Sequence, residues 1–381
     1  MRASWAWDSL PWYGDDGHHR WPLVAHYPQV VGWDKPGDKE HMPVAIGQHP
    51  LSFIGRSFHN GQQPATDDYD VTPLTDKGPY FEEQWKHALE VDPQFVFVTG
   101  WNEWMAGGQV CRTTDQEALN AIWNFYPGAH LTRAGHPLKL GDVYFIDQYN
   151  QELSRDAEQM RGGHTDNYYY QLVANIRRFK GVRQLPKASA AKTIDIKGCF
   201  SQWEDIQPEF RDHLYETLPR NEPGWGSAGN YVNNSGRNEF VRLKVEHDAQ
   251  NVYFYAQSRQ AVTPYTDPNW MLLFINRDQS KDTGWDGYNY LVNYPVIDSQ
   301  HTSVKANAGG WRWKMIGEST YRVEGNQLML SVPRALIGQV DQPLSFDFHW
   351  ADNIEGSGKT EDFFLNGDTA PNRRFDYHYQ E

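Results

Sequence analysis

One stretch of the sequence combines side chains that could do chemistry: Trp101, Asn102, Glu103 and Trp104, within FVFVTGWNEWMAGG at 95–108. A carboxylate can serve as general acid, general base or nucleophile, and glycosidic bonds are commonly hydrolysed by a pair of carboxyl groups. Indole rings present apolar faces that suit the apolar side of a sugar ring. The residue types therefore indicate chemistry on a carbohydrate, with Glu103 as the first catalytic candidate. The alternative is a glutamate that braces the surrounding structure through hydrogen bonds.

A strand must position this stretch. Phe95–Val98 is a short run of β-branched and aromatic residues without helical period or alternation, which predicts a strand buried on both faces of a parallel sheet. Parallel α/β folds carry their chemistry at the carboxyl ends of strands. Asp147 follows the apolar run 143–146 in the same way and is the candidate for the second carboxylate, unless it only caps a loop. A hydrolytic pair should be about 5–10 Å apart.

Four residues near predicted strand ends are candidates for binding a sugar. His49 ends the run Val44–His49 and could bond a hydroxyl, although a structural histidine is the alternative. Asn102 could bind a hydroxyl or tie the loop. Trp101 and Trp104 cannot both point inward if the chain stays extended, so one is expected to be a binding platform and the other a core residue.

Strand-then-helix units recur along residues 1–183. Helices are predicted at 80–90, 115–125 and 166–179 from their apolar spacing. Four such units predict a (β/α) TIM-barrel type of fold, but a closed barrel takes eight strands and usually about 250 residues. We therefore expect a partial barrel, its later half, with the rest supplied by a preceding segment or by a second copy in a homo-oligomer.

The pattern changes after residues 184–192, QLPKASAAK, which have the composition of a linker. Residues 193–381 contain short alternating runs separated by Gly, Asn and Asp turns, which predicts an antiparallel β-sandwich. The predicted strands are 240–245, 251–256, 271–275, 288–292, 311–315, 327–332 and 344–350.

Aromatic and acidic residues of the predicted sandwich are binding candidates. Trp285, Trp311 and Trp313 could stack sugar rings, and the last two share a face if they lie in one strand. The alternative is that they belong to the core, as aromatic residues of sandwiches usually do. Asp278, Asp282 and Asp286 offer oxygen ligands in a turn-rich loop; they are weak candidates for calcium, since acidic turns are commonly just solvated.

Composition narrows the classes of partner. The 381 residues carry a net charge of −14, with 49 acidic and 35 basic residues, which argues against nucleic acid and anionic membranes. Aromatic residues make up 14%, more than a core of this size requires, which favours a neutral polymer such as a polysaccharide or oligosaccharide. No apolar run approaches the roughly 20 residues of a membrane span. The first residues lack the pattern of a signal peptide, so we expect either a cytoplasmic protein or a secreted or periplasmic parent protein.

The first half resembles the carboxyl half of a bacterial glycoside hydrolase barrel related to glycoside hydrolase families 71 and 99. In family 99, the NEW motif continues to a second catalytic glutamate three residues after the first; Glu103 matches the first, and Ala106 stands at the second. The resemblance therefore implies that the partner carboxylate comes from elsewhere. The segments that carry the likeness are HRWPLVAHYPQVVGWD, VAIGQHP, GRSFHNG, VTGWNEW and VYFIDQYNQELSRDAEQMRGGHTDNYYYQLVANIRRFKG.

Six segments of the second half form a recognisable pattern: Ile194–Gly198, Trp203, Leu273–Asn276, Thr283–Tyr288, Val332–Arg334 and Arg374–Tyr377. In these segments the second half resembles family 9 carbohydrate-binding modules and the related DOMON-like sandwiches. This likeness implies sugar stacking between aromatic rings and structural calcium in the sandwich.

Two hypotheses follow. The first is an enzyme that hydrolyses O-glycosidic bonds through Glu103 and Asp147, without a cofactor for catalysis and with an appended carbohydrate-binding module. The alternative is a non-catalytic carbohydrate-binding protein with an incomplete barrel.

Overall fold

The computed structural model describes residues 4–7, 21–25, 27–33, 35, 37–47, 54–64, 74–103, 109–110, 132–133, 136–137, 139–144, 151–159, 164–216, 218–223, 230–340 and 343–381. The chain divides into two compact units, unit 1 at Met1–Arg183 and unit 2 at Gln184–Glu381. The division lies where the predicted linker 184–192 begins, and part of that linker is bonded into unit 2: the Ser189 N–H donates to Gln207 O and the Lys192 N–H to His247 O. Among the described helices, none has the length and apolar character needed to span a bilayer.

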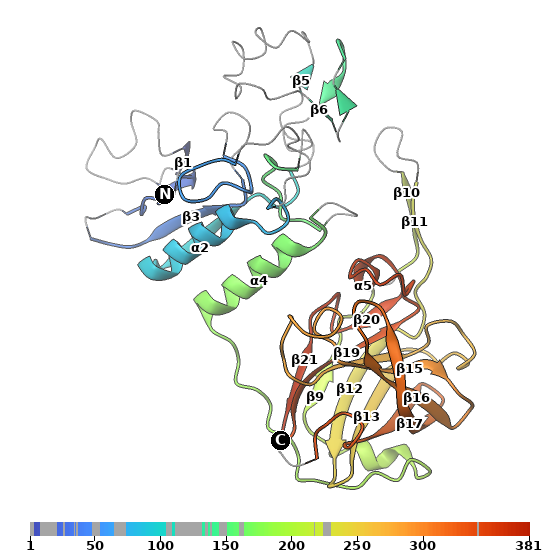
Figure 1. Cartoon of the computed structure of the whole chain (residues 1–381). Helices are drawn as coiled ribbons and strands as arrows, with labels where there is room; N and C mark the ends of the chain where they lie inside the picture. The colour runs from blue at the N-terminus through green and yellow to red at the C-terminus, as the bar shows by residue number, and fades with distance from the viewer. Residues whose placement is uncertain are drawn as a thin grey trace. The chain divides into compact units, whose positions relative to one another are not determined.

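The described part of unit 1 contains two parallel strand pairs and two long helices, and the predicted helix 115–125 lies outside the described residues. Figure 1 shows helix α2 beside strand β3 and helix α4 beside α2. Helix α2 starts with Pro79, and its buried residues recur at helical spacing, so one side packs on the apolar side chains of β3. The elements are β1 (Ser4–Trp7), β2 (Trp21–Val24), β3 (His41–Ala45), α2 (Pro79–Val91), β4 (Phe95–Thr99), β5 (Gln109–Val110), β6 (Thr132–Arg133), β7 (His136–Pro137), β8 (Val143–Tyr144) and α4 (Asn167–Lys180).

The described part of unit 1 is not a partial TIM barrel, so that prediction was wrong. Strands β1 and β2 pair in parallel, as do β3 and β4, but β8 pairs antiparallel with the two-residue strand β5. Strand β4 is covered mainly on one face, where Val96 and Val98 pack against the helix core, while Phe97 is 42% exposed. The run 95–98 is apolar throughout partly because Phe95 also has an apolar contact: its ring packs edge-on against Trp21. These strands give no half-barrel for a second copy to complete.

Unit 2 is built on one antiparallel sheet of eleven strands, and the predicted antiparallel β architecture of residues 193–381 is confirmed. The sheet runs in the order β20-β19-β14-β15-β16-β17-β18-β13-β12-β9, with β21 paired to β19. Its strands are β9 (Glu209–Arg211), β12 (Phe240–His247), β13 (Asn251–Ser258), β14 (Leu272–Asn276), β15 (Tyr290–Val296), β16 (His301–Asn307), β17 (Trp313–Glu324), β18 (Gln327–Pro333), β19 (Ser345–Asp352), β20 (Asp368–Ala370) and β21 (Tyr377–Gln380).

The eleven-stranded sheet curls until its two edges approach each other, giving a nearly closed barrel-like sheet that fits the predicted sandwich. At this seam, the Phe240 N–H at the start of β12 donates to the Asp368 carboxylate at the start of β20. The Tyr377 hydroxyl on β21 donates to Arg211 O at 2.9 Å. Three elements stand outside the sheet: the 3-10 helix η2 (Phe200–Trp203), the hairpin β10 (Arg220–Pro223) with β11 (Asn230–Asn233), and the short helix α5 (Asp362–Leu365).

Alternation along the strands separates the sheet into an inner and an outer face. The inner face holds the main core, to which Leu243, Phe254 and Leu328 contribute. The outer face carries two smaller apolar clusters, and these position the sites described below. One lies on β13 and β18 beneath residues 194–206. The other lies on β14, β15 and β19 beside Trp285 and Phe363.

Candidate functional site

Glu103 lies at the surface, just beyond the carboxyl end of β4. Gly100 makes the turn out of the strand with a φ of 92°, and a Cβ there would collide with the carbonyl oxygen of Arg155. The Glu103 N–H then donates to Asp156 Oδ1 at 2.8 Å. Its carboxylate pairs with Arg155 at 3.1 Å, while 48% of the Glu103 side chain remains exposed. Glu103 is therefore oriented by its neighbours and open to a solute.

The other candidates in unit 1 fall into two groups. Trp101 is 42% exposed, with its ring edge-on to Tyr169 at 5.9 Å, and Asn102 is also exposed. His49, Trp104 and Asp147 lie outside the described residues. Of the predicted catalytic pair, the described residues thus contain Glu103 alone.

A buried carboxylate in unit 1 was missed from the sequence. Glu152 is fully buried, and its two oxygens accept hydrogen bonds from the Ser57 N–H and hydroxyl, the Gln63 amide and the Thr75 hydroxyl at 2.6–2.8 Å. These four donors bond both oxygens of the carboxylate, which offsets the cost of burying it. We assign Glu152 a structural role: it fixes the segment 151–159, which in turn holds Glu103.

A buried arginine supports the same segment. Arg56 donates to Ser154 O, Ser154 Oγ and Asp156 O at 2.8–3.2 Å, and its guanidinium carbon lies 4.3 Å from the centroid of the Tyr168 ring. Burial and the nearby Arg56 charge lower the pKa of His164 to about 2, so this histidine is neutral. The sequence signal that could have revealed the cluster is the run 152–156, in which three of the five residues are charged.

The three tryptophans predicted in unit 2 have different positions. Trp285 is only 7% exposed, and its indole N–H donates to Gly358 O at 3.0 Å, so it is a core residue rather than a stacking surface. Trp311 and Trp313 are half-buried at the sheet surface. Their ring centroids are 5.8 Å apart, but their planes meet at 88°. The two rings do not share one strand face, because Trp311 lies in the turn before β17 and only Trp313 lies in the strand. Their role in stacking a sugar stays a prediction.

A third half-buried ring completes this surface. Tyr294 on β15 lies 6.0 Å from Trp311 between ring centroids, and Lys305 Nζ lies 4.9 Å from the centroid of Tyr294. We call Tyr294, Trp311 and Trp313 the aromatic corner. Phe274 and Trp285 pack behind it, which fixes the rings. The aromatic corner offers apolar ring surface next to a charged amine, a combination that suits a sugar ring with its hydroxyl groups.

The predicted calcium ligands are not brought together. Asp278 accepts hydrogen bonds from the Thr283 hydroxyl and the Ser280 N–H, and Asp286 pairs with Arg374 at 3.5 Å. Asp282 is exposed. Within the described ranges, the group of side chains with metal-ligand spacing is a different one. It consists of Asp212, Glu216 and Asp368, each offering an oxygen within 4.8 Å of the others.

This acidic triad lies at the seam of the barrel-like sheet. Asp212 follows β9, and Asp368 begins β20. Burial and the neighbouring Glu216 carboxylate raise the pKa of Asp212 to about 9. Burial and Asp212 raise the pKa of Asp368 well above its usual value, and burial raises that of Glu216. Since like charges this close cannot all ionise, the triad must hold protons at neutral pH or be balanced by a cation.

Compared with models of protein families, with curated proteins and with solved structures, the chain matches none. The two family resemblances in the sequence therefore stay predictions, and the function has to be argued from the sites themselves.

Proposed function

We propose that this chain binds carbohydrate through unit 2, with the aromatic corner as the place where a sugar ring stacks. The observation that carries the proposal is the meeting of three half-buried rings on the outer face of the sheet. Two perpendicular indoles form an angle into which one sugar ring fits, with one ring against its apolar face and the other at its edge. The excess of aromatic residues and the net charge of −14 support a neutral polymer as ligand.

Affinity electrophoresis of the full chain tests this proposal. Native gels containing a panel of soluble neutral polysaccharides should retard the chain in at least one case, relative to a gel without polymer. Serum albumin run beside it controls for sieving. Unchanged mobility in every gel of a broad panel would contradict the proposal.

A second candidate function is hydrolysis of O-glycosidic bonds in unit 1. The observation that favours it is the exposed carboxylate of Glu103 at a strand end, next to the exposed ring of Trp101. Arg155 orients this carboxylate through the bond to Oε2, which suits a nucleophile or general base more than a proton donor. The second carboxylate predicted for the reaction is Asp147.

Glu103→Gln is expected to lower the hydrolytic rate at least about 100-fold on any polysaccharide that the wild type cleaves, because the amide can neither attack nor accept a proton. Release of reducing ends measures the rate. Glu90→Gln, an exposed glutamate on α2, is the matched control and should keep the wild-type rate. Equal rates for wild type and Glu103→Gln would exclude Glu103 from the reaction.

A further inference from the structure

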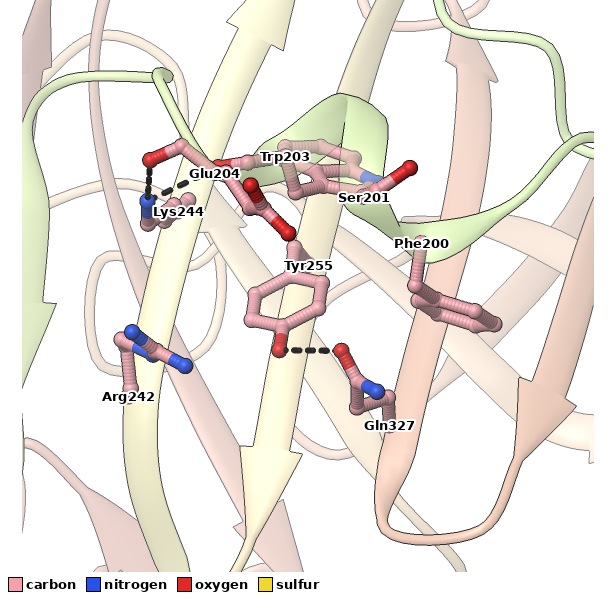
Figure 2. Close-up of a pocket in the computed structure, with 8 residues that line it drawn as sticks. All are labelled: Phe200, Ser201, Trp203, Glu204, Arg242, Lys244, Tyr255 and Gln327. Atoms are coloured by element: carbon pink, nitrogen blue, oxygen red, sulfur yellow. Dashed lines mark hydrogen bonds between the residues drawn. The ribbon is translucent and has the colours of Figure 1, made fainter.

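A small cavity of about 180 Å³ opens on the outer face of unit 2, at the edge of the cluster beneath residues 194–206. Figure 2 shows Arg242 and Lys244 from β12, Tyr255 from β13 and Gln327 from β18 facing it. They share this face because their neighbours in sequence, such as Leu243 and Phe254, point into the inner core. Helix η2 and Glu204 form the opposite wall.

The cavity is pre-formed. The Lys244 ammonium donates to the carbonyl oxygens of Trp203 and Glu204 at 2.8 and 3.1 Å, which fixes the end of η2 above the sheet. The Trp203 ring packs on Tyr255 with centroids 5.3 Å apart. The Tyr255 hydroxyl in turn donates to Gln327 Oε1 at 2.8 Å. A ligand entering here would meet side chains that are already ordered, which lowers the entropic cost of binding.

The lining is polar and carries a local excess of positive charge. Glu209 accepts from Arg211 at 2.8 Å and lies 3.4 Å from Arg242 and 3.8 Å from Lys244, so one carboxylate faces three cations. Of the residues that line the cavity, Arg242 and Lys244 are cationic and Glu204 is anionic, so the lining itself carries one net positive charge. Outside the lining, Arg211 is 81% exposed and Asp205 also acts on Lys244. In a chain whose net charge is −14, such a cavity favours an anion over the surrounding surface.

Arg242 retains donor capacity toward the cavity. Its side chain is 39% exposed, and among the described residues it directs Nε and Nη2 at one oxygen of Gln257 and Nη1 at Glu209, with the Tyr255 hydroxyl as a further partner. A guanidinium has five N–H groups, so a donor remains for a ligand. Lys244 is 3% exposed, uses two of its three N–H groups on carbonyl oxygens and lies 3.8 Å from Glu209, so it contributes charge to the cavity rather than a free donor. A guanidinium pairs with carboxylate or phosphate oxygens, and the Gln327 amide and Glu204 can bond hydroxyl groups, so a ligand that carries both a carboxylate and hydroxyl groups suits this lining.

We propose that this cavity binds a uronate, a sugar ring that carries a carboxylate, either as a free monosaccharide or as a residue of an acidic polysaccharide. The volume is below the roughly 300–1,000 Å³ of sites for drug-sized ligands, which limits the ligand to about one ring. The proposal deepens the proposed function by adding an anionic sugar to the ligands of unit 2, at a site separate from the aromatic corner.

Calorimetric titration of the full chain with galacturonate, and with galactose as the neutral counterpart, tests the inference. We expect galacturonate to bind at least tenfold more tightly than galactose. Arg242→Met keeps much of the aliphatic stem and should weaken galacturonate binding at least tenfold, whereas Arg183→Met, at an exposed arginine, should not. Titration with polygalacturonate distinguishes the two sources: binding of the polymer at equal uronate concentration assigns the site to a chain residue, and binding of the monosaccharide alone assigns it to the free sugar.

Arg242→Met also removes the ion pair with Glu209, so a loss of binding by that variant alone does not separate binding from folding. Gln327→Glu is a second variant that leaves this ion pair intact. The new carboxylate can still accept the Tyr255 hydrogen bond but repels a uronate, so galacturonate binding should fall at least tenfold at an unchanged melting temperature. The inference is overturned if galacturonate does not bind, binds no better than galactose, or binds to Arg242→Met and Gln327→Glu as tightly as to the wild type. Trp311→Ala separates this site from the proposed function, because it should abolish retardation by a neutral polysaccharide and leave galacturonate binding unchanged.

Discussion

Asp212→Asn is expected to stabilise unit 2 at pH 8 and to flatten the dependence of its stability on pH. The folded-state pKa of Asp212 is about 9, above the usual value of 3.8. Between pH 3.8 and about 9, Asp212 binds a proton in the folded state that it has lost in the unfolded state. The contribution of Asp212 to the free energy of unfolding is therefore fully present below about pH 4 and is lost as pH rises toward 9, by at most about 1.4 kcal/mol per pH unit for one group. An amide needs no proton, so the variant escapes this loss.

Scanning calorimetry of the full chain between pH 5 and 9 in the presence of a chelator measures the effect. Asp278→Asn, at an exposed aspartate in the turn after β14, is the matched control and should follow the wild-type profile. A variant that melts below the wild type at pH 8, or that keeps its full pH dependence, would contradict the shared-proton account of the triad.

Adding calcium distinguishes a triad that is neutralised by protons from one that is neutralised by a bound cation. The structural calcium predicted for the sandwich would be held by Asp212, Glu216 and Asp368 rather than by the predicted loop. In that case, calcium at pH 8 should raise the melting temperature of the wild type and have little effect on Asp212→Asn. Equal responses of both proteins would place any bound calcium elsewhere.

Trp311→Ala is expected to abolish most of the carbohydrate binding by unit 2. Trp311 contacts both Tyr294 and Trp313, so its removal takes away the central ring of the aromatic corner. A buried aromatic anchor of a binding site commonly contributes about 2 kcal/mol or more, which corresponds to roughly 30-fold in affinity. Titration with an oligosaccharide of the polymer that retards the chain measures the loss.

Two further variants serve as controls for the Trp311→Ala result. Trp101→Ala removes an exposed tryptophan of unit 1 and should bind as the wild type does. Trp311→Phe keeps an aromatic face and should recover part of the affinity lost in Trp311→Ala. If the alanine variant binds with the wild-type affinity and remains folded, the sugar does not stack at the aromatic corner.

Much of the fold could be predicted from local patterns in the sequence. Helices α2 and α4 were predicted within one or two residues at each end, because their apolar residues recur at helical spacing. The seven predicted strands of unit 2 all correspond to observed strands, since residues such as Leu243 and Val245 alternate with polar ones. Such signals depend on neighbours in sequence and therefore survive without knowledge of the tertiary structure.

The features that the sequence analysis missed or predicted wrongly depend on contacts between distant residues or on turn geometry. The acidic triad exists only because the seam brings the segment after β9 next to β20, which no local pattern encodes. Trp311 was assigned to the strand of Trp313, but Gly309 and Gly310 with positive φ turn the chain just before it. The apolar run of β4 resembled a central barrel strand although a single helix-packed face and one ring contact explain it.

The most direct test is a crystal structure of the full chain with an oligosaccharide derived from the polysaccharide that retards it. We expect one sugar ring with its apolar face within about 4 Å of the Trp311 indole and its edge toward Trp313. An oligosaccharide bound elsewhere on the chain, with the aromatic corner free of sugar, would contradict the central claim.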